Sequence, residues 1–202
     1  MDFFHFPHHH SSQSVAHFAL FRDVKNSQAL RKRIIAAATI EGADGDQERE
    51  AVNFAFIDAR LITGRLHLQT AISQAILADS QGAIRTKSVH SEILWALNPT
   101  NNITEALRRY GVSDTTTDLI VVRVGEANLD SAKIQELMEE VVLGKMVPFS
   151  ELKNITDWSP IKKYHKLIGE VAVQESKGNI SRERAIVDNI VISTVAVKTV
   201  MA

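Results

Sequence analysis

Histidine is the residue type in this chain that most readily suggests metal or acid–base chemistry. Five of the eight histidines lie near the start of the 202-residue sequence, at His5, His8, His9, His10 and His17. A metal site needs several ligands on a defined element, yet this run contains no cysteine or acidic residue and its spacing is not helical. We therefore interpret residues 1–14 as a flexible polar N-terminus, and we expect no metal ion and no cofactor.

The remaining histidines do not form a recognisable catalytic motif. His67, His90 and His165 are far apart in the sequence, so each is interpreted as a surface or half-buried side chain rather than a catalytic base. The chain has no cysteine and none of the patterns GxGxxG, GxxxxGK[ST], GxSxG or HExxH. These observations predict a binding module and not an enzyme. A histidine-dependent metal-binding enzyme and a purely structural adaptor stay open as alternatives.

Cations gather at two places in the sequence. Arg31–Arg33 lie on one side of an expected helix, where a solvated face is the ordinary interpretation. Arg85 and Lys87 are combined with the hydroxyls of Thr86 and Ser88 at an expected helix N-terminus, and this combination suits phosphate groups. An ordinary loop is the alternative interpretation of this second cluster.

The charge balance limits what a nucleic-acid site in this chain can be. The sequence has 23 Lys and Arg against 24 Asp and Glu, for a formal net charge of −1. A uniformly basic nucleic-acid coat protein is therefore excluded, and any RNA contact must be local. Asn101 and Asn102 follow the second cationic cluster at another expected helix cap, where their amides are placed to reach base edges.

Apolar and β-branched runs predict the strands of a sheet. They lie at residues 15–22, 53–61, 118–124 and 145–149, the last as an edge strand because Pro148 cannot donate to a central ladder. Residues 41–50 contain five acids and two glycines, which predicts a solvated acidic loop inserted within one domain.

Caps and one-sided apolar stripes predict the helices. The expected starts are Asn26 or Ser27, Gly64, Ser88, Asn102, Asp130 and the pair Ser159-Pro160. Gly111 is placed just after one of these helices, where a left-handed residue is favoured, and the length of residues 181–200 favours a final helix. Together the elements predict one α/β (α+β) domain over residues 15–202, a small mixed sheet packed by several helices.

The last two predicted helices carry more apolar surface than one core stripe needs. In the final helix Val187, Val191 and Val195 lie beside a second apolar row, which favours a surface for a partner protein. The alternative is that both rows are core. The most apolar stretch, at residues 190–197, is far shorter than the roughly 20 residues that cross a bilayer, so no membrane partner is expected.

Three blocks of the sequence resemble one protein family. They are LFRDVKNSQALRKR at residues 20–33, RTKSVHSEILWALNPTNNITEALRRYGV at residues 85–112 and SPIKKYHKL at residues 159–167. The blocks resemble the small kinase-binding subunits of the KEOPS/EKC complex, the family of the human PRPK-binding protein. The middle block is the most specific of the three. The histidine-rich start and the acidic residues 41–50 depart from the family pattern.

This resemblance implies a subunit with no active site of its own. Such a subunit binds the small kinase-like ATPase of the complex, other KEOPS subunits through it, and tRNA including the 3′ CCA end. The complex makes the threonylcarbamoyl-adenosine modification of tRNAs that read ANN codons, and in fungi it is linked to telomeres and transcription, in the nucleus and the cytoplasm. The expected tRNA-binding residues are Arg85, Thr86, Lys87, Ser88, Asn101 and Asn102. The expected kinase-binding residues are Ile161, Tyr164, Val187, Val191 and Val195.

Overall fold

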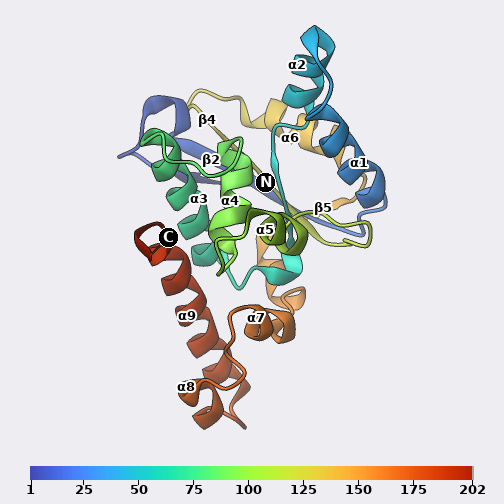
Figure 1. The fold of residues 1–202 in the computed structure, drawn as a ribbon. Helices are drawn as coiled ribbons and strands as arrows, with labels where there is room; N and C mark the ends of the chain where they lie inside the picture. Colours follow the sequence, from blue (N-terminus) through green and yellow to red (C-terminus); the bar gives the residue numbers. More distant parts are fainter. Residues whose placement is uncertain (202) are drawn as a thin grey trace.

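A computed structural model describes residues 1–201, without the side chains of Ser11 and Met201. Its centre is a sheet with the strand order β1-β2-β4-β3, and β5 pairs with the end of β2 that β1 leaves free (Figure 1). The strands are β1 (Asp2–His5), β2 (Val15–Arg22), β3 (Ala55–Asp58), β4 (Leu119–Gly125) and β5 (Lys145–Val147). These pairings are all antiparallel, which corrects the expectation of a mixed sheet, while the α+β class is confirmed.

Helices precede, follow and connect these strands. The α-helices of the described chain are α1 (Ser27–Ala37), α2 (Gly42–Ala51), α3 (Arg65–Ser80), α4 (Val89–Leu97), α5 (Ile103–Tyr110), α6 (Ser131–Val141), α7 (Trp158–Tyr164), α8 (Val171–Glu175) and α9 (Ile180–Met201). Short 3₁₀ turns lie at η1 (Ser11–Gln13), η2 (Ala59–Leu61) and η3 (Phe149–Asn154). The predicted final helix and the predicted edge strand are both confirmed.

The sheet has an apolar layer on each face because side chains alternate along a strand. On one face Phe18 and Leu20 of β2 belong to a core that α3, α4 and α9 complete. On the other face Phe21 belongs to a smaller core that includes Leu30 of α1 and Ile134 of α6. Figure 1 shows α9 beside α3, so the C-terminal helix is part of the larger core and not an appendage.

Several helices begin where their local caps predict. The Ser88 hydroxyl accepts the Ser91 N–H at 3.2 Å in a reciprocal capping box, and the Asn102 side chain accepts the Glu105 N–H at 2.9 Å. Asp130 caps α6 in the same way. These caps depend on residues two or three positions apart, which is why sequence alone finds them.

The first fourteen residues are not a free polar terminus, and that prediction is wrong. Residues 2–5 form β1 against β2, and the side chains of Phe4 and Phe6 are buried. The Phe4 ring stacks on that of Phe18 with 4.4 Å between centroids. The phenylalanines that alternate with the polar residues, and not the histidines, determine how this segment packs.

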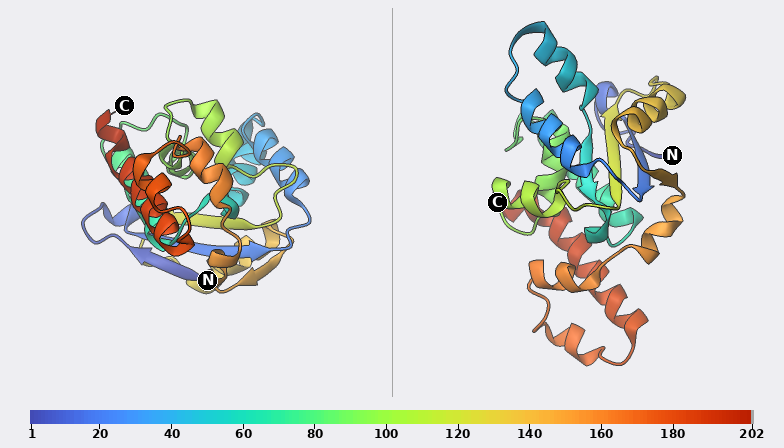
Figure 2. Two further views of the ribbon diagram at one scale, coloured as in Figure 1. Left: turned by 90° about the horizontal axis from the view of Figure 1, so that it is seen from below. Right: turned by 90° about the vertical axis from the view of Figure 1, so that its right-hand side faces the viewer.

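The predicted acidic loop is also wrong, because the segment 41–50 folds as helix α2. The Arg33 guanidinium donates to both carboxylate oxygens of Glu48, at 2.9 and 3.2 Å, and Arg49 donates to the Ile40 carbonyl at 2.7 Å. Arg49 also donates to the carbonyl of Ala37, the last residue of α1, at 3.1 Å, so α2 is joined to α1 by both arginines. In Figures 1 and 2 the two helices extend from one end of the molecule, opposite the end formed by α8.

Two smaller predictions about helix ends also need correction. Gly111 has φ −78° and ψ 167°, so it is extended rather than left-handed. A Cβ at this position would lie 2.4 Å from the Leu107 carbonyl oxygen, so close backbone approach, not handedness, explains the glycine. Helix α7 begins one residue before Ser159, with the Asp157 carboxylate accepting the Ser159 N–H at 3.0 Å.

Candidate functional site

The loop before α4 is held in place by one buried carboxylate. Glu92 is 1% exposed, and its Oε2 accepts the backbone N–H of Arg85 at 3.0 Å, the N–H of Thr86 at 2.9 Å and the Thr86 hydroxyl at 2.7 Å. The Thr86 hydroxyl is therefore engaged with Glu92, and the Ser88 hydroxyl is engaged with Ser91 of α4. Arg85 and Lys87 remain exposed on it. We call Arg85–Ser88 the basic loop.

The indole of Trp95 connects the basic loop to the turn after α4. The Arg85 guanidinium lies 5.3 Å from the centroid of the Trp95 ring, within cation–π range. The indole N–H donates in turn to the Asn101 carbonyl at 3.4 Å. The structure thus brings Arg85 and Asn101, sixteen positions apart in the sequence, to one aromatic side chain. Asn102 lies next to them, but its side-chain oxygen is used to cap α5.

A second cation, Lys198 of α9, lies against the same indole. Its Nζ is 3.8 Å from the centroid of the Trp95 ring, and it donates to the carbonyl oxygens of Trp95, Asn98 and Thr100. Burial lowers the pKa of Lys198 to about 7, against an opposing effect of Glu92 that raises the pKa, while Arg85 lowers it further. This region therefore holds two cations and one carboxylate around an aromatic ring.

Sequence reasoning missed Glu92, Trp95 and Lys198. Trp95 and Glu92 lie in an apolar helix that resembles ordinary core, and Lys198 ends a long apolar stretch. The signal in the sequence was that each is a polar or amphipathic side chain within an apolar run. Burying a polar group without a hydrogen-bond partner costs free energy, so such a residue is expected to have a specific partner.

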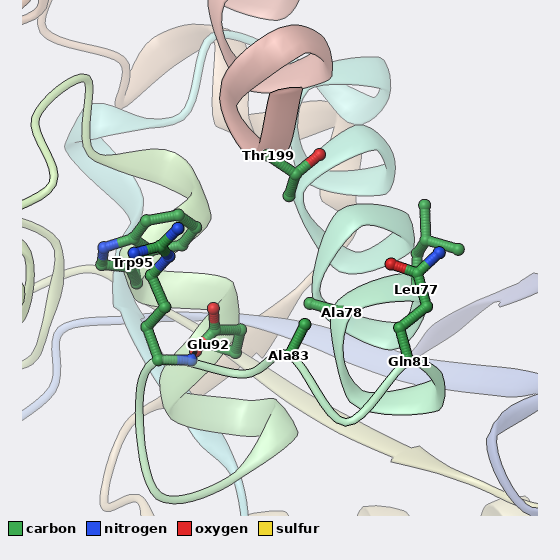
Figure 3. Close-up of a pocket in the computed structure, with 8 residues that line it drawn as sticks. Leu77, Ala78, Gln81, Ala83, Glu92, Trp95 and Thr199 are labelled. Carbon is green, nitrogen blue, oxygen red and sulfur yellow. Dashed lines mark hydrogen bonds between the residues drawn. The ribbon is translucent and has the colours of Figure 1, made fainter. Parts of the chain in front are cut away.

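A small pocket lies beside Trp95 and is too small for a nucleotide. It has a volume of about 90 Å³ and is lined by Leu77, Ala78, Gln81, Ala83, Arg85, Glu92, Trp95 and Thr199. Figure 3 shows Glu92 and Trp95 on one wall, Leu77 and Gln81 on the other, and Thr199 between them from α9. A water occupies about 30 Å³, so the pocket fits a few solvent molecules. A larger ligand does not fit inside this pocket.

The predicted kinase-binding residues are, with one exception, core residues. Ile161, Val187, Val191 and Val195 are at most 1% exposed and lie in the larger core, so the assignment of these four to a surface is wrong. The three valines, spaced four residues apart, mark the side of α9 that faces the protein interior, whereas Ile161 lies in α7. Tyr164 is half-buried, and the Arg109 guanidinium covers its ring at 4.4 Å.

The exposed side of α9 is different in character. Asn189, Ile190, Ser193, Thr194 and Val197 line a shallow depression on it, and we call these five residues the uncharged α9 face. Val197 is 44% exposed. No Asp, Glu, Lys or Arg occurs between residues 189 and 197. The neighbouring helix α3 packs alongside, and the Thr199 hydroxyl donates to Gln74 at 2.9 Å.

Two of the isolated histidines are fully buried rather than at the surface. His67 and His90 have pKa values lowered to about 3, mainly by burial, and His165 has one lowered to about 4 for the same reason. His90 Nε2 accepts the Val124 N–H at 3.0 Å, so this side chain satisfies a backbone donor near the end of β4.

Within residues 1–201, no three His, Asp or Glu side chains are arranged to hold a metal ion. None of the helices in this range has the length and hydrophobicity that crossing a bilayer requires.

The fold and the site define an α+β protein with two candidate binding surfaces, the basic loop and the uncharged α9 face. The family model described as "Kinase binding protein CGI-121" matches residues 21–199, and the chain belongs to this family. This confirms the resemblance seen in the three sequence blocks.

Curated relatives agree with this assignment along most of the chain. The "EKC/KEOPS complex subunit CGI121" of Cryptococcus neoformans is 32% identical over an alignment of 234 positions, gaps included, which covers 100% of both chains. The subunit of the same name from Aspergillus fumigatus is 37% identical over 164 residues, 80% of each chain. That of Neurospora crassa is 32% identical over 207 residues, 94% of this chain and 95% of the relative.

Proposed function

We propose that this chain is a non-catalytic subunit of a KEOPS/EKC complex that binds the kinase-like ATPase subunit and the 3′ end of tRNA. The names of the curated relatives support the complex, and the name of the family supports the kinase contact. In this role the chain supports threonylcarbamoyl-adenosine modification of tRNA, in the nucleus and the cytoplasm. Contributions to telomere maintenance and transcription belong to the same proposal.

The observation that supports RNA binding is the arrangement of the basic loop. Glu92 fixes the loop backbone, so the Arg85 and Lys87 side chains extend from a rigid support at the start of α4. Helix N-termini and nearby cations favour phosphate. A single-stranded end suits such a surface because its bases are unstacked and its backbone can follow the loop.

Reversing both loop charges is expected to abolish tRNA binding. The double variant Arg85→Glu, Lys87→Glu replaces two phosphate contacts with repulsion, and removing one phosphate contact lowers the salt slope by about 0.7 for a single strand. Gel shifts at matched salt measure this, and tRNA trimmed of its CCA end should bind the wild type about as poorly. Circular dichroism should be unchanged.

The matched control reverses two exposed lysines elsewhere, Lys163→Glu and Lys177→Glu. Neither makes an ion pair within residues 1–201, and this variant should bind tRNA nearly as the wild type does. Equal affinity of the loop variant and the wild type would place the RNA site elsewhere, with Arg31–Arg33 tested next. If the wild type binds no tRNA in this titration, the chain is a structural adaptor.

For the kinase-like subunit we propose the uncharged α9 face. Val197 is exposed and Ile190, which also packs against the larger core, is half-buried on a helix surface free of charges. An apolar partner loses no ion hydration on docking there. The double variant Ser193→Asp, Val197→Asp should stop co-purification with the kinase-like subunit while tRNA binding remains. A complex that survives this variant on gel filtration would show that the kinase-like subunit binds elsewhere.

A further inference from the structure

Lys198 uses all of its hydrogen-bonding capacity inside the protein. An ammonium group has three donors and no acceptor. The Lys198 Nζ donates to the carbonyl oxygens of Trp95, of Asn98 at 2.5 Å and of Thr100 at 3.0 Å. The centroid of the Trp95 ring lies 3.8 Å from the same nitrogen. The negative face of the ring and the three carbonyl dipoles therefore all stabilise the positive charge of Lys198.

These carbonyls belong to the end of α4 and to the turn that follows it. The Trp95 carbonyl also accepts the Asn98 N–H, and the Thr100 carbonyl also accepts the Asn98 side-chain amide. The C-terminal end of a helix carries partial negative charge, which a cation stabilises. Here the cation comes from α9, about a hundred positions along the chain. Lys198 therefore fixes both the Trp95 backbone and the turn that carries Asn101, whose carbonyl accepts the indole N–H.

The other groups around Lys198 balance its charge only partly. The Glu92 carboxylate of α4 favours the ammonium form, whereas the Arg85 guanidinium of the basic loop opposes it. His165, after α7, also interacts with this ammonium, and its pKa lowered to about 4 keeps the imidazole neutral near neutral pH. Burial remains the largest influence, and it lowers the pKa of Lys198 to about 7.

We propose that Lys198 is a positioning residue for RNA, whose ammonium form holds Trp95 and the following turn in the arrangement that presents Arg85 and Asn101. This inference rests on the proposed tRNA binding. A neutral amine has two donors and a lone pair, so it cannot serve three carbonyls, and its lone pair would face a carbonyl or the ring. Loss of the Lys198 proton therefore breaks at least one of these hydrogen bonds, and RNA affinity weakens with it.

The first test compares tRNA binding at about pH 6 and about pH 8.5 at matched salt, a range in which an unburied lysine keeps its proton. The wild type should bind about tenfold more weakly at the higher pH, as expected when roughly one hydrogen bond to RNA is broken.

Three variants assign this change to Lys198. Lys198→Met, which keeps the length of the side chain without its charge, should bind tRNA weakly at both pH values. Lys198→Arg keeps a charge that does not titrate, so its affinity should be the same at both. Lys177→Met is the matched control and should behave as the wild type.

A second measurement needs neither RNA nor a stable Lys198→Met variant. The chain has two tryptophans, so in a Trp158→Phe background the fluorescence reports Trp95 alone. It should titrate with a midpoint near the Lys198 pKa of about 7, and the transition should vanish in Lys198→Arg. Equal tRNA affinity of Lys198→Met and the wild type overturns the positioning role of Lys198, and flat fluorescence overturns the dependence of that role on pH. Failure of the wild type to bind tRNA at either pH overturns the proposed function instead.

Discussion

Lowering the pH from about 7.5 to about 5 is expected to reduce the free energy of unfolding by about 6 kcal/mol, because the fold holds His67, His90 and His165 neutral. Buried His17, whose pKa is also lowered by burial, acts in the same direction. Burial is the main cause in each case, lowering the pKa of His67 and His90 to about 3 and that of His165 to about 4. Nearby cations add to the effect, with Arg123 acting on His90 and Arg109 on His165.

The sign of the change follows from which state binds protons. An unfolded histidine has a pKa of about 6.5, so below that pH the unfolded chain gains protons that the folded chain refuses, and stability falls as pH falls. A pH of about 5 is roughly 1.5 units below the unfolded pKa of 6.5. The free energy of unfolding therefore falls by about 2 kcal/mol for each histidine. Above about pH 6.5 both states are neutral and the contribution is zero. Lys198, whose pKa is lowered to about 7, adds less than about 1 kcal/mol in the same direction.

Urea unfolding at the two pH values measures this loss, and one variant assigns part of it. In His90→Gln an amide oxygen can still accept the Val124 N–H, but the side chain no longer titrates. The difference between the two pH values should therefore shrink by about 2 kcal/mol. His8→Gln, at an exposed position, is the matched control and should leave the difference unchanged. A pH difference that His90→Gln does not reduce would contradict the argument.

The elements that sequence could predict are those whose stabilising contacts are local. Ser88, Asn102 and Asp130 cap their helices through neighbours two or three residues away. Helix α2 was missed because its contacts with α1 come from Arg33 and Arg49, and charge content alone suggests a loop. Strand β1 was missed for a similar reason, since only its pairing with β2 gives its phenylalanines a place to pack.

The residues of the candidate site also fall into those that sequence could predict and those that only the folded structure reveals. The cations of the basic loop were predicted, because two hydroxyls and two cations before a helix are visible in four consecutive residues. The residues that hold the surrounding backbone, Glu92 and Lys198, act through the folded structure, and Lys198 reaches Trp95 across 103 positions. Apolar periodicity also has a limit. It shows which residues share a side of α9, but not whether that side meets the core or a partner.

A single pair of substitutions on α9 separates those two possibilities. Val191 is fully buried in the larger core, whereas Val197, less than two turns further along, is 44% exposed. We expect Val191→Asp to lower the free energy of unfolding by more than about 4 kcal/mol, because it buries a carboxylate with no partner. Val197→Asp places the same carboxylate in water and should change that free energy by no more than about 0.5 kcal/mol.

Urea unfolding of the isolated chain distinguishes these effects before any partner is added. Val191→Asp should unfold early or fail to fold, and its loss of kinase binding would then follow from its loss of structure. Val197→Asp should unfold as the wild type does and still lose much of its affinity for the kinase-like subunit. If Val191→Asp instead unfolded at the wild-type urea concentration and lost only its partner, Val191 would belong to the interface after all. The buried and exposed rows of α9 would then have exchanged roles, and the uncharged α9 face would no longer be the docking surface.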